Sequence, residues 1–92
     1  MKDYTIAQTA DESVYVAQVR KIKAERPGYT NTERLQDVDC SDIFIFTYDD
    51  GTITVYYDTD VDAVYVKSDM HIEELLVNKP FHVKSVIIEP RK

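Results

Sequence analysis

Residues 43–58 read IFIFTYDDGTITVYYD, two runs of β-branched and aromatic residues separated by a short acidic turn. Such runs are typical of strands, and Asp-Gly is a dipeptide that tight hairpin turns prefer. The stretch therefore predicts an antiparallel hairpin with strands at 43–48 and 52–58. Both sides of the first strand are apolar, which predicts a central strand that is covered on both faces. In the second strand, Ile53, Val55 and Tyr57 share one face, and the opposite face is more polar.

The chain before the hairpin predicts two helices. Thr9 and Glu12 have the Thr-x-x-Glu spacing of a capping box, and the apolar residues that follow recur on one helical face up to Pro27. Thr30 and Glu33 repeat this spacing, so they predict a short second helix that ends at Gln36.

Further elements are predicted on both sides of these. Residues 4–6 are a short extended segment, residues 63–67 a third strand, residues 70–77 a helix and residues 81–89 a last strand. The order α-α-β-β-β-α-β predicts an α+β fold, with a three-stranded antiparallel meander plus a C-terminal strand packed against two or three helices. A chain of 92 residues is the size of one domain, so we expect a single acidic α+β domain over residues 1–92.

The negative charge of the chain is concentrated in its middle. The whole chain has a net charge of -6, whereas residues 36–74 carry 11 acidic side chains against Lys67 alone, a net charge of -10. Phosphates and anionic lipids repel such a protein, so we expect basic partners, no direct nucleic-acid binding and no membrane binding. One cysteine, Cys40, and the lack of a signal peptide or long apolar run predict a cytoplasmic protein.

Motifs for catalysis and metal binding are weak. The sequence has no glycine-rich phosphate loop and no nucleophile elbow, and the acids near Cys40 disfavour a reactive thiolate. The Asp-x-Asp-x-Asp run at 58–62 partly matches a calcium loop, but Ala63 stands where that loop requires glycine. We therefore predict a protein that is not an enzyme and has neither a cofactor nor a specific metal site.

The acidic side chains suggest how a basic partner is bound. Alternate strand residues lie about 6.6 Å apart and neighbouring strands about 4.8 Å apart, which is similar to the spacing of phosphates along DNA. We expect the carboxylates to gather at strand ends and turns, with tyrosines supplying contact area between them. The candidate partner-binding residues are Asp37, Asp39, Asp42, Asp49, Asp50, Asp58, Asp60, Asp62, Asp69, Glu73, Glu74 and Tyr56. Tyr65 is a further contact residue, whereas Tyr57 is expected to pack inside the protein.

In its length, acidic strand turns and mildly basic ends, the chain resembles small early phage proteins that block host defences, including Arn-like anti-restriction proteins and anti-CRISPR proteins. The resemblance implies a non-catalytic DNA mimic, often a homodimer. Such a mimic occupies the nucleic-acid-binding surface of a nuclease or nucleoid protein in the host cytoplasm. The alternative is a small soluble protein–protein interaction module without nucleic-acid mimicry.

Overall fold

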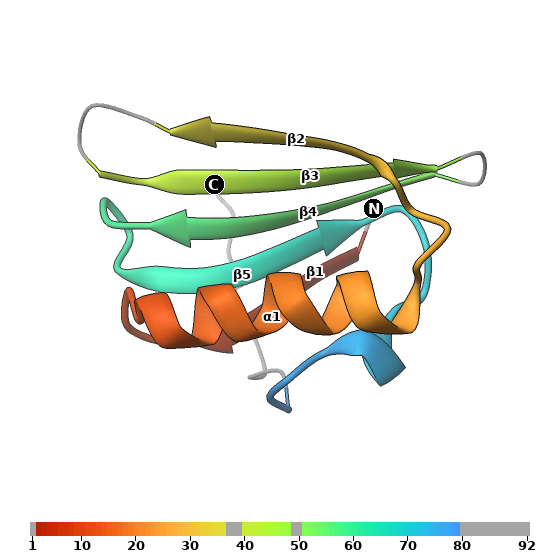
Figure 1. Cartoon of the computed structure of the whole chain (residues 1–92). Helices are drawn as coiled ribbons and strands as arrows, with labels where there is room; N and C mark the ends of the chain where they lie inside the picture. The colour runs from red at the N-terminus through yellow and green to blue at the C-terminus, as the bar shows by residue number, and fades with distance from the viewer. Residues whose placement is uncertain (1, 37–39, 49–50, 80–92) are drawn as a thin grey trace, which may run out of the picture.

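A computed structural model of the chain describes residues 2–36, 40–48 and 51–79. In chain order (Figure 1), its elements are β1 (Lys2–Ala7), α1 (Glu12–Glu25), β2 (Asn31–Gln36), β3 (Asp42–Tyr48), β4 (Gly51–Asp58), β5 (Ala63–Ser68) and the 3-10 turn η1 (Glu73–Leu75). The last predicted strand, 81–89, lies outside the described residues.

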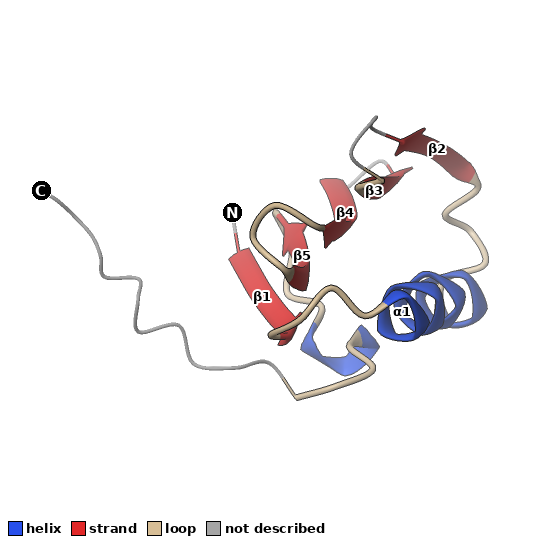
Figure 2. Cartoon of the chain, turned by 90° about the vertical axis from the view of Figure 1, so that its left-hand side faces the viewer, coloured by secondary structure: helices blue, strands red, loops and turns tan. Residues whose placement is uncertain are grey.

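The strands form one antiparallel sheet in the order β1-β5-β4-β3-β2. The pairing of β3 with β4 confirms the predicted hairpin, with Tyr48 opposite Gly51. Strand β1, at the edge beside β5, contains the short extended segment predicted at 4–6. α1 and η1 lie on the same side of the sheet (Figure 2).

The predicted α-α-β-β-β-α-β arrangement is wrong. The described chain has a five-stranded antiparallel sheet and one α-helix, whereas we predicted a three-stranded meander with two or three helices. Three segments account for this difference: β1 adds a strand beside β5, and two predicted helices form something else.

Residues 31–36 form the edge strand β2 and not a second helix. All six residues pair with β3, from Asn31 opposite Thr47 to Gln36 opposite Asp42. A helix of one or two turns is unstable alone, because its first turn fixes several residues for a single hydrogen bond. The strand instead pairs with the open backbone edge of β3, so tertiary pairing overrides the capping pattern.

Residues 70–77 contain only the turn η1 and not the predicted helix. On α1, Gln18 donates from Nε2 to the carbonyl oxygen of Leu75 (2.8 Å) and accepts at Oε1 from the backbone amide of Val77 (3.0 Å). These two backbone groups are thus bonded to α1 and not along a helix of their own. The apolar side chains of the segment are nonetheless buried, namely Ile72, Leu75 and Leu76.

Helix α1 begins later than the capping box predicts. Its N-cap is Asp11, whose Oδ1 accepts from the backbone amide of Ser13 (3.0 Å) and from the Ser13 hydroxyl (2.6 Å). The Ser13 hydroxyl, and then the backbone amides, hold the pKa of the Asp11 carboxyl below its usual value. Tyr15, Val19 and Ile22 are buried, which confirms the predicted apolar face of the helix.

The core lies between the sheet and the layer formed by α1 and η1. Ile53 and Val55 of β4, and Val64 and Val66 of β5, have 0% of their surface exposed. Because alternate strand residues point to opposite faces, the residues between them point away from the core, on the side of the sheet that no described element covers.

Gln18→Leu is expected to lower the free energy of unfolding by about 2–4 kcal/mol. The substitution leaves one carbonyl and one amide without their partner, and each unsatisfied group costs about 1–3 kcal/mol. Urea denaturation measures the change, with the exposed Gln8→Leu as the control, for which we expect a change below about 0.5 kcal/mol. Equal midpoints for the two variants would show that Gln18 does not hold this segment.

Candidate functional site

The uncovered side of the sheet carries a row of apolar and aromatic side chains. Through the register, Leu35 lies opposite Ile43, Ile43 opposite Tyr56, Tyr56 opposite Tyr65, and Tyr65 opposite Thr5. Residues directly opposite in antiparallel strands share a face, so this row crosses all five strands. Leu35 is 45% exposed, and the other members of the row are half-buried.

A second row runs beside the first and is more polar. It comprises Glu33, Ile45, Thr54, Lys67 and Asp3, again directly opposite one another. We call these two rows, together with Asp58 at the end of β4, the open face. Ile43 and Ile45 of β3 lie on this face, so the prediction that β3 is covered on both sides is wrong for the described residues.

Tyr56 and Tyr65 form the centre of the open face. Their rings stack with centroids 4.6 Å apart, and the Tyr65 hydroxyl donates to Oδ2 of Asp58 at 2.8 Å. Burial, followed by the hydrogen bond to Asp58, raises the pKa of the Tyr65 phenol well above its usual value. The phenol therefore stays neutral and continues to donate at any physiological pH.

Three of the predicted binding residues gather at the turn between β4 and β5. Asp58 ends β4, and Asp60 and Asp62 follow it as exposed residues. Asp58 Oδ1 accepts from the backbone amides of Asp60 (3.0 Å) and Val61 (3.3 Å), and Asp62 Oδ1 accepts from that of Ala10 (2.7 Å). These three residues are called the turn acids below.

Three other predicted residues lie at the opposite end of β4. Asp69 accepts from the backbone amide of Thr52 at 2.9 Å, and Asp58 is six residues further along the strand, which is about 20 Å at 3.3 Å per residue. Glu74 pairs with Arg26 at 2.8 Å, and Glu73 is exposed. The described carboxylates thus form two separate groups and not one stripe.

Asp42 is placed inside the protein and not on a binding surface. It is 6% exposed and forms an ion pair with Arg34, with 2.6 Å between Oδ2 and Nη2. Burial raises the pKa of the neighbouring Tyr15 to about 12, and the Asp42 carboxylate adds to the increase. This pair holds β2 against β3. The remaining predicted acids, Asp37, Asp39, Asp49 and Asp50, lie outside the described residues.

Each of the two tyrosines on β4 lies on the face of the sheet that strand alternation predicts. Tyr57 packs against the core, with its ring centroid 5.8 Å from that of Tyr15, which confirms the prediction. Tyr56 lies on the open face, as a partner-binding residue requires. Leu35 was not predicted as a site residue, because residues 31–36 were expected to form a helix.

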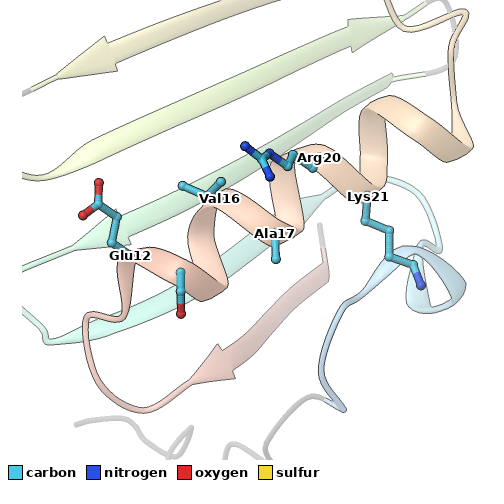
Figure 3. Close-up of a pocket in the computed structure, with 6 residues that line it drawn as sticks. Glu12, Val16, Ala17, Arg20 and Lys21 are labelled. Atoms are coloured by element: carbon cyan, nitrogen blue, oxygen red, sulfur yellow. The ribbon is translucent and has the colours of Figure 1, made fainter.

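A depression of about 720 Å³ lies along the exposed side of α1 (Figure 3). All of its lining residues belong to α1, so no second element encloses it. Glu12, Val16 and Arg20 point to one side, and Ala17 and Lys21 to the other (Figure 3). We therefore regard this depression as ordinary helix surface.

A scan of protein-family models and searches of curated proteins and solved structures found no match to this chain. The resemblance to phage defence inhibitors therefore stays a prediction, as does the homodimer. Neither helix of the described segments is long and apolar enough to cross a membrane. Within those same segments, no group of three His, Cys, Asp or Glu residues is arranged to hold a metal ion.

The free energy of unfolding is expected to fall less at alkaline pH for Tyr65→Phe than for the wild type. A folded-state pKa raised above the usual value near 10 means that the neutral phenol contributes stability below pH 10. This contribution is lost as the pH rises through the folded-state pKa. Urea unfolding at about pH 8 and about pH 11 should thus show a smaller difference for Tyr65→Phe than for the wild type.

The control is Tyr48→Phe, because Tyr48 is 42% exposed and lies on the inner side of β3. Its stability should fall with pH as steeply as that of the wild type. The same slope for Tyr65→Phe would contradict a stabilising role of the neutral phenol.

Proposed function

We propose that the protein is a non-catalytic binding module that holds a basic protein against its open face. The observation that carries this proposal is the row from Leu35 to Thr5, which places apolar and aromatic side chains on β2 to β5, and Thr5 on β1, with no described element covering them. Exposed apolar patches rimmed by polar residues are typical of protein-binding surfaces.

The size of the open face indicates what else the partner contacts. Five strands spaced about 4.8 Å apart span about 19 Å, and six residues of strand span about 20 Å, which is roughly 400 Å². Standard interfaces bury about 800 Å² on each partner. A stable complex therefore also involves the flanking turns, and the turn acids are continuous with the open face through Asp58.

The charges around the open face favour a basic partner. Asp3, Glu33 and Asp58 belong to the face, and Lys67 is its one cation. Opposite charge at the rim speeds association and excludes acidic proteins. We place the activity in the cytoplasm, or in the host cytoplasm if a phage encodes the chain. Cys40 is exposed and free, as suits a reducing compartment.

Ile45→Lys is expected to abolish capture of a basic partner, because it adds a like charge within the second row. Tagged protein is exposed to cell lysate at low salt, and captured proteins are identified by mass spectrometry. Val16→Lys is the control, since Val16 is 37% exposed on α1, on the other side of the sheet. If Ile45→Lys leaves the capture unchanged, or if only acidic proteins are captured, the open face is not the surface that binds a basic partner.

Nucleic-acid mimicry is a second candidate, favoured by the turn acids. They place three carboxylates within five residues, two of them exposed, beside the surface that we assign to the partner. In this version of the proposal the partner is a nuclease or nucleoid protein of the host. The turn acids then occupy positions that DNA phosphates take on the partner.

Excess duplex DNA is expected to displace the captured partner if the turn acids mimic DNA. The double variant Asp60→Asn with Asp62→Asn should weaken the complex and flatten its salt dependence, because fewer charges meet the partner. The control with the same loss of charge is Glu73→Gln with Asp69→Asn at the far end. If the partner binds DNA and this protein at the same time, mimicry is ruled out, but the proposal of a binding module is not.

A further inference from the structure

A small cavity opens on the open face at the end of β4. Its volume is about 160 Å³, the room of about five water molecules at ~30 Å³ each. It is lined by Ser41, Ile43, Tyr56, Tyr57, Asp58, Asp60 and Tyr65. Of the three tyrosines, Tyr57 has its ring on the core side of β4, so the aromatic surface on the open face comes from Tyr56 and Tyr65. The lining also contains two carboxylates and no basic residue, so the cavity combines aromatic surface with negative charge.

The aromatic part of the lining already attracts a cation of the chain itself. The Lys67 ammonium lies 5.5 Å from the ring centroid of Tyr56 and 5.8 Å from that of Tyr65. A cation within about 6 Å of a ring is drawn to the negative charge on the ring face. Lys67 therefore shows, within this protein, which kind of group the stacked pair accepts.

The lysine and the carboxylate flank the tyrosine pair from opposite sides along the strands. Lys67 follows Tyr65 by two residues on β5, whereas Asp58 lies opposite Ala63, two residues before Tyr65. The side of the pair next to Asp58 is the side where the cavity opens, since Asp58 and Asp60 line it. A second cation can thus approach the tyrosines without displacing Lys67.

The Asp58 carboxylate is fixed in place before any partner arrives. Its two oxygens accept from the amides of Asp60 and Val61 and from the Tyr65 hydroxyl, at 3.0, 3.3 and 2.8 Å. A carboxylate has about four acceptor sites, so one further donor can bind it. Binding then costs little ordering of this side chain, which favours affinity.

We propose that this cavity accepts the guanidinium group of an arginine side chain on the partner. The inference rests on the proposed function and names the anchor by which the basic partner holds the open face. A guanidinium is planar, stacks on aromatic rings and can donate one N–H to the acceptor site that remains on Asp58, and it loses its hydration more readily than an ammonium. A metal ion suits the cavity less well, because a hard cation requires about six or more oxygens.

The direct test uses N-acetyl-arginine amide as the probe, titrated into the protein at low salt and followed by amide NMR. The expected result is saturable shifts confined to residues around the cavity, in the millimolar range. N-acetyl-citrulline amide has nearly the same shape without the charge, and it should give no saturable shifts. Shifts that are equal for the two probes, or that lie elsewhere, would overturn the proposal.

Substitutions separate the aromatic contribution from the fold. Tyr56→Leu should weaken binding of the arginine probe about tenfold, whereas Tyr56→Phe should retain it, because only the former removes the ring. Tyr48→Leu is the matched control, since that ring stacks on Tyr29 away from the open face. Lys67→Met should strengthen binding about two- to fivefold by removing a like charge. Unchanged binding in both Tyr56→Leu and Lys67→Met would exclude the tyrosine pair as the site.

Failure of this inference differs from failure of the proposed function. If a basic protein binds the open face and Tyr56→Leu leaves its affinity unchanged, the binding module stands and the arginine anchor is wrong. If the arginine probe binds as expected and no basic protein is captured, the cavity stands and the proposed function is wrong.

Discussion

One helix has to cover a sheet that is about twice its width. An α-helix with its side chains is about 10 Å across, whereas five strands span about 19 Å. The segment around η1 therefore shares the inner layer with α1, and Ile72, Leu75 and Leu76 contribute the apolar surface that the helix lacks. Gln18 joins the two parts of this layer through both ends of its amide. With these elements used on one side, no described element is left for the other, and the open face follows.

Much of the acidity has a local structural use. Asp11, Asp58, Asp62 and Asp69 each accept a hydrogen bond from a backbone amide at a helix start, turn or strand end. Short acidic side chains are favoured at such positions because they satisfy amides that have no partner in a helix or sheet. This role leaves the charge in place, because accepting a hydrogen bond from an amide does not neutralise a carboxylate. The net charge of -6 still opposes compaction, and the basic partner that we propose would relieve this repulsion.

The parts of the fold that depend on local periodicity could be predicted from the sequence. The apolar face of α1 and the β3–β4 hairpin are of this kind, and so is the inward direction of Tyr57. Strand β2 and the turn η1 could not be predicted, because each is decided by a distant partner. Residues 31–36 are extended because β3 offers an edge, and the η1 segment is held by Gln18, which is more than 50 residues away.

The candidate site was harder to predict than the fold, because it depends on register. A shift of one residue in a strand moves every side chain to the other face, so only the actual pairing shows that Leu35, Ile43, Tyr56 and Tyr65 share a row. The sequence did predict that acids gather at turns. It could not show that one of them, Asp42, is buried against Arg34, because that pairing requires β2 to be a strand.

In the function that we propose, the open face and the turn acids affect different steps of binding. Exposed charges act at a distance of about 8 Å at physiological salt, so they mainly govern how fast a partner arrives. Apolar and aromatic contacts form only after docking, so they mainly govern how long the partner stays. Asp58 belongs to both sets, because it is one of the turn acids and also accepts the Tyr65 hydroxyl. Next to Asp58, a partner side chain can contact the charge of the turn acids and the aromatic surface of the open face together. Arginine suits this position, because its guanidinium is both charged and planar.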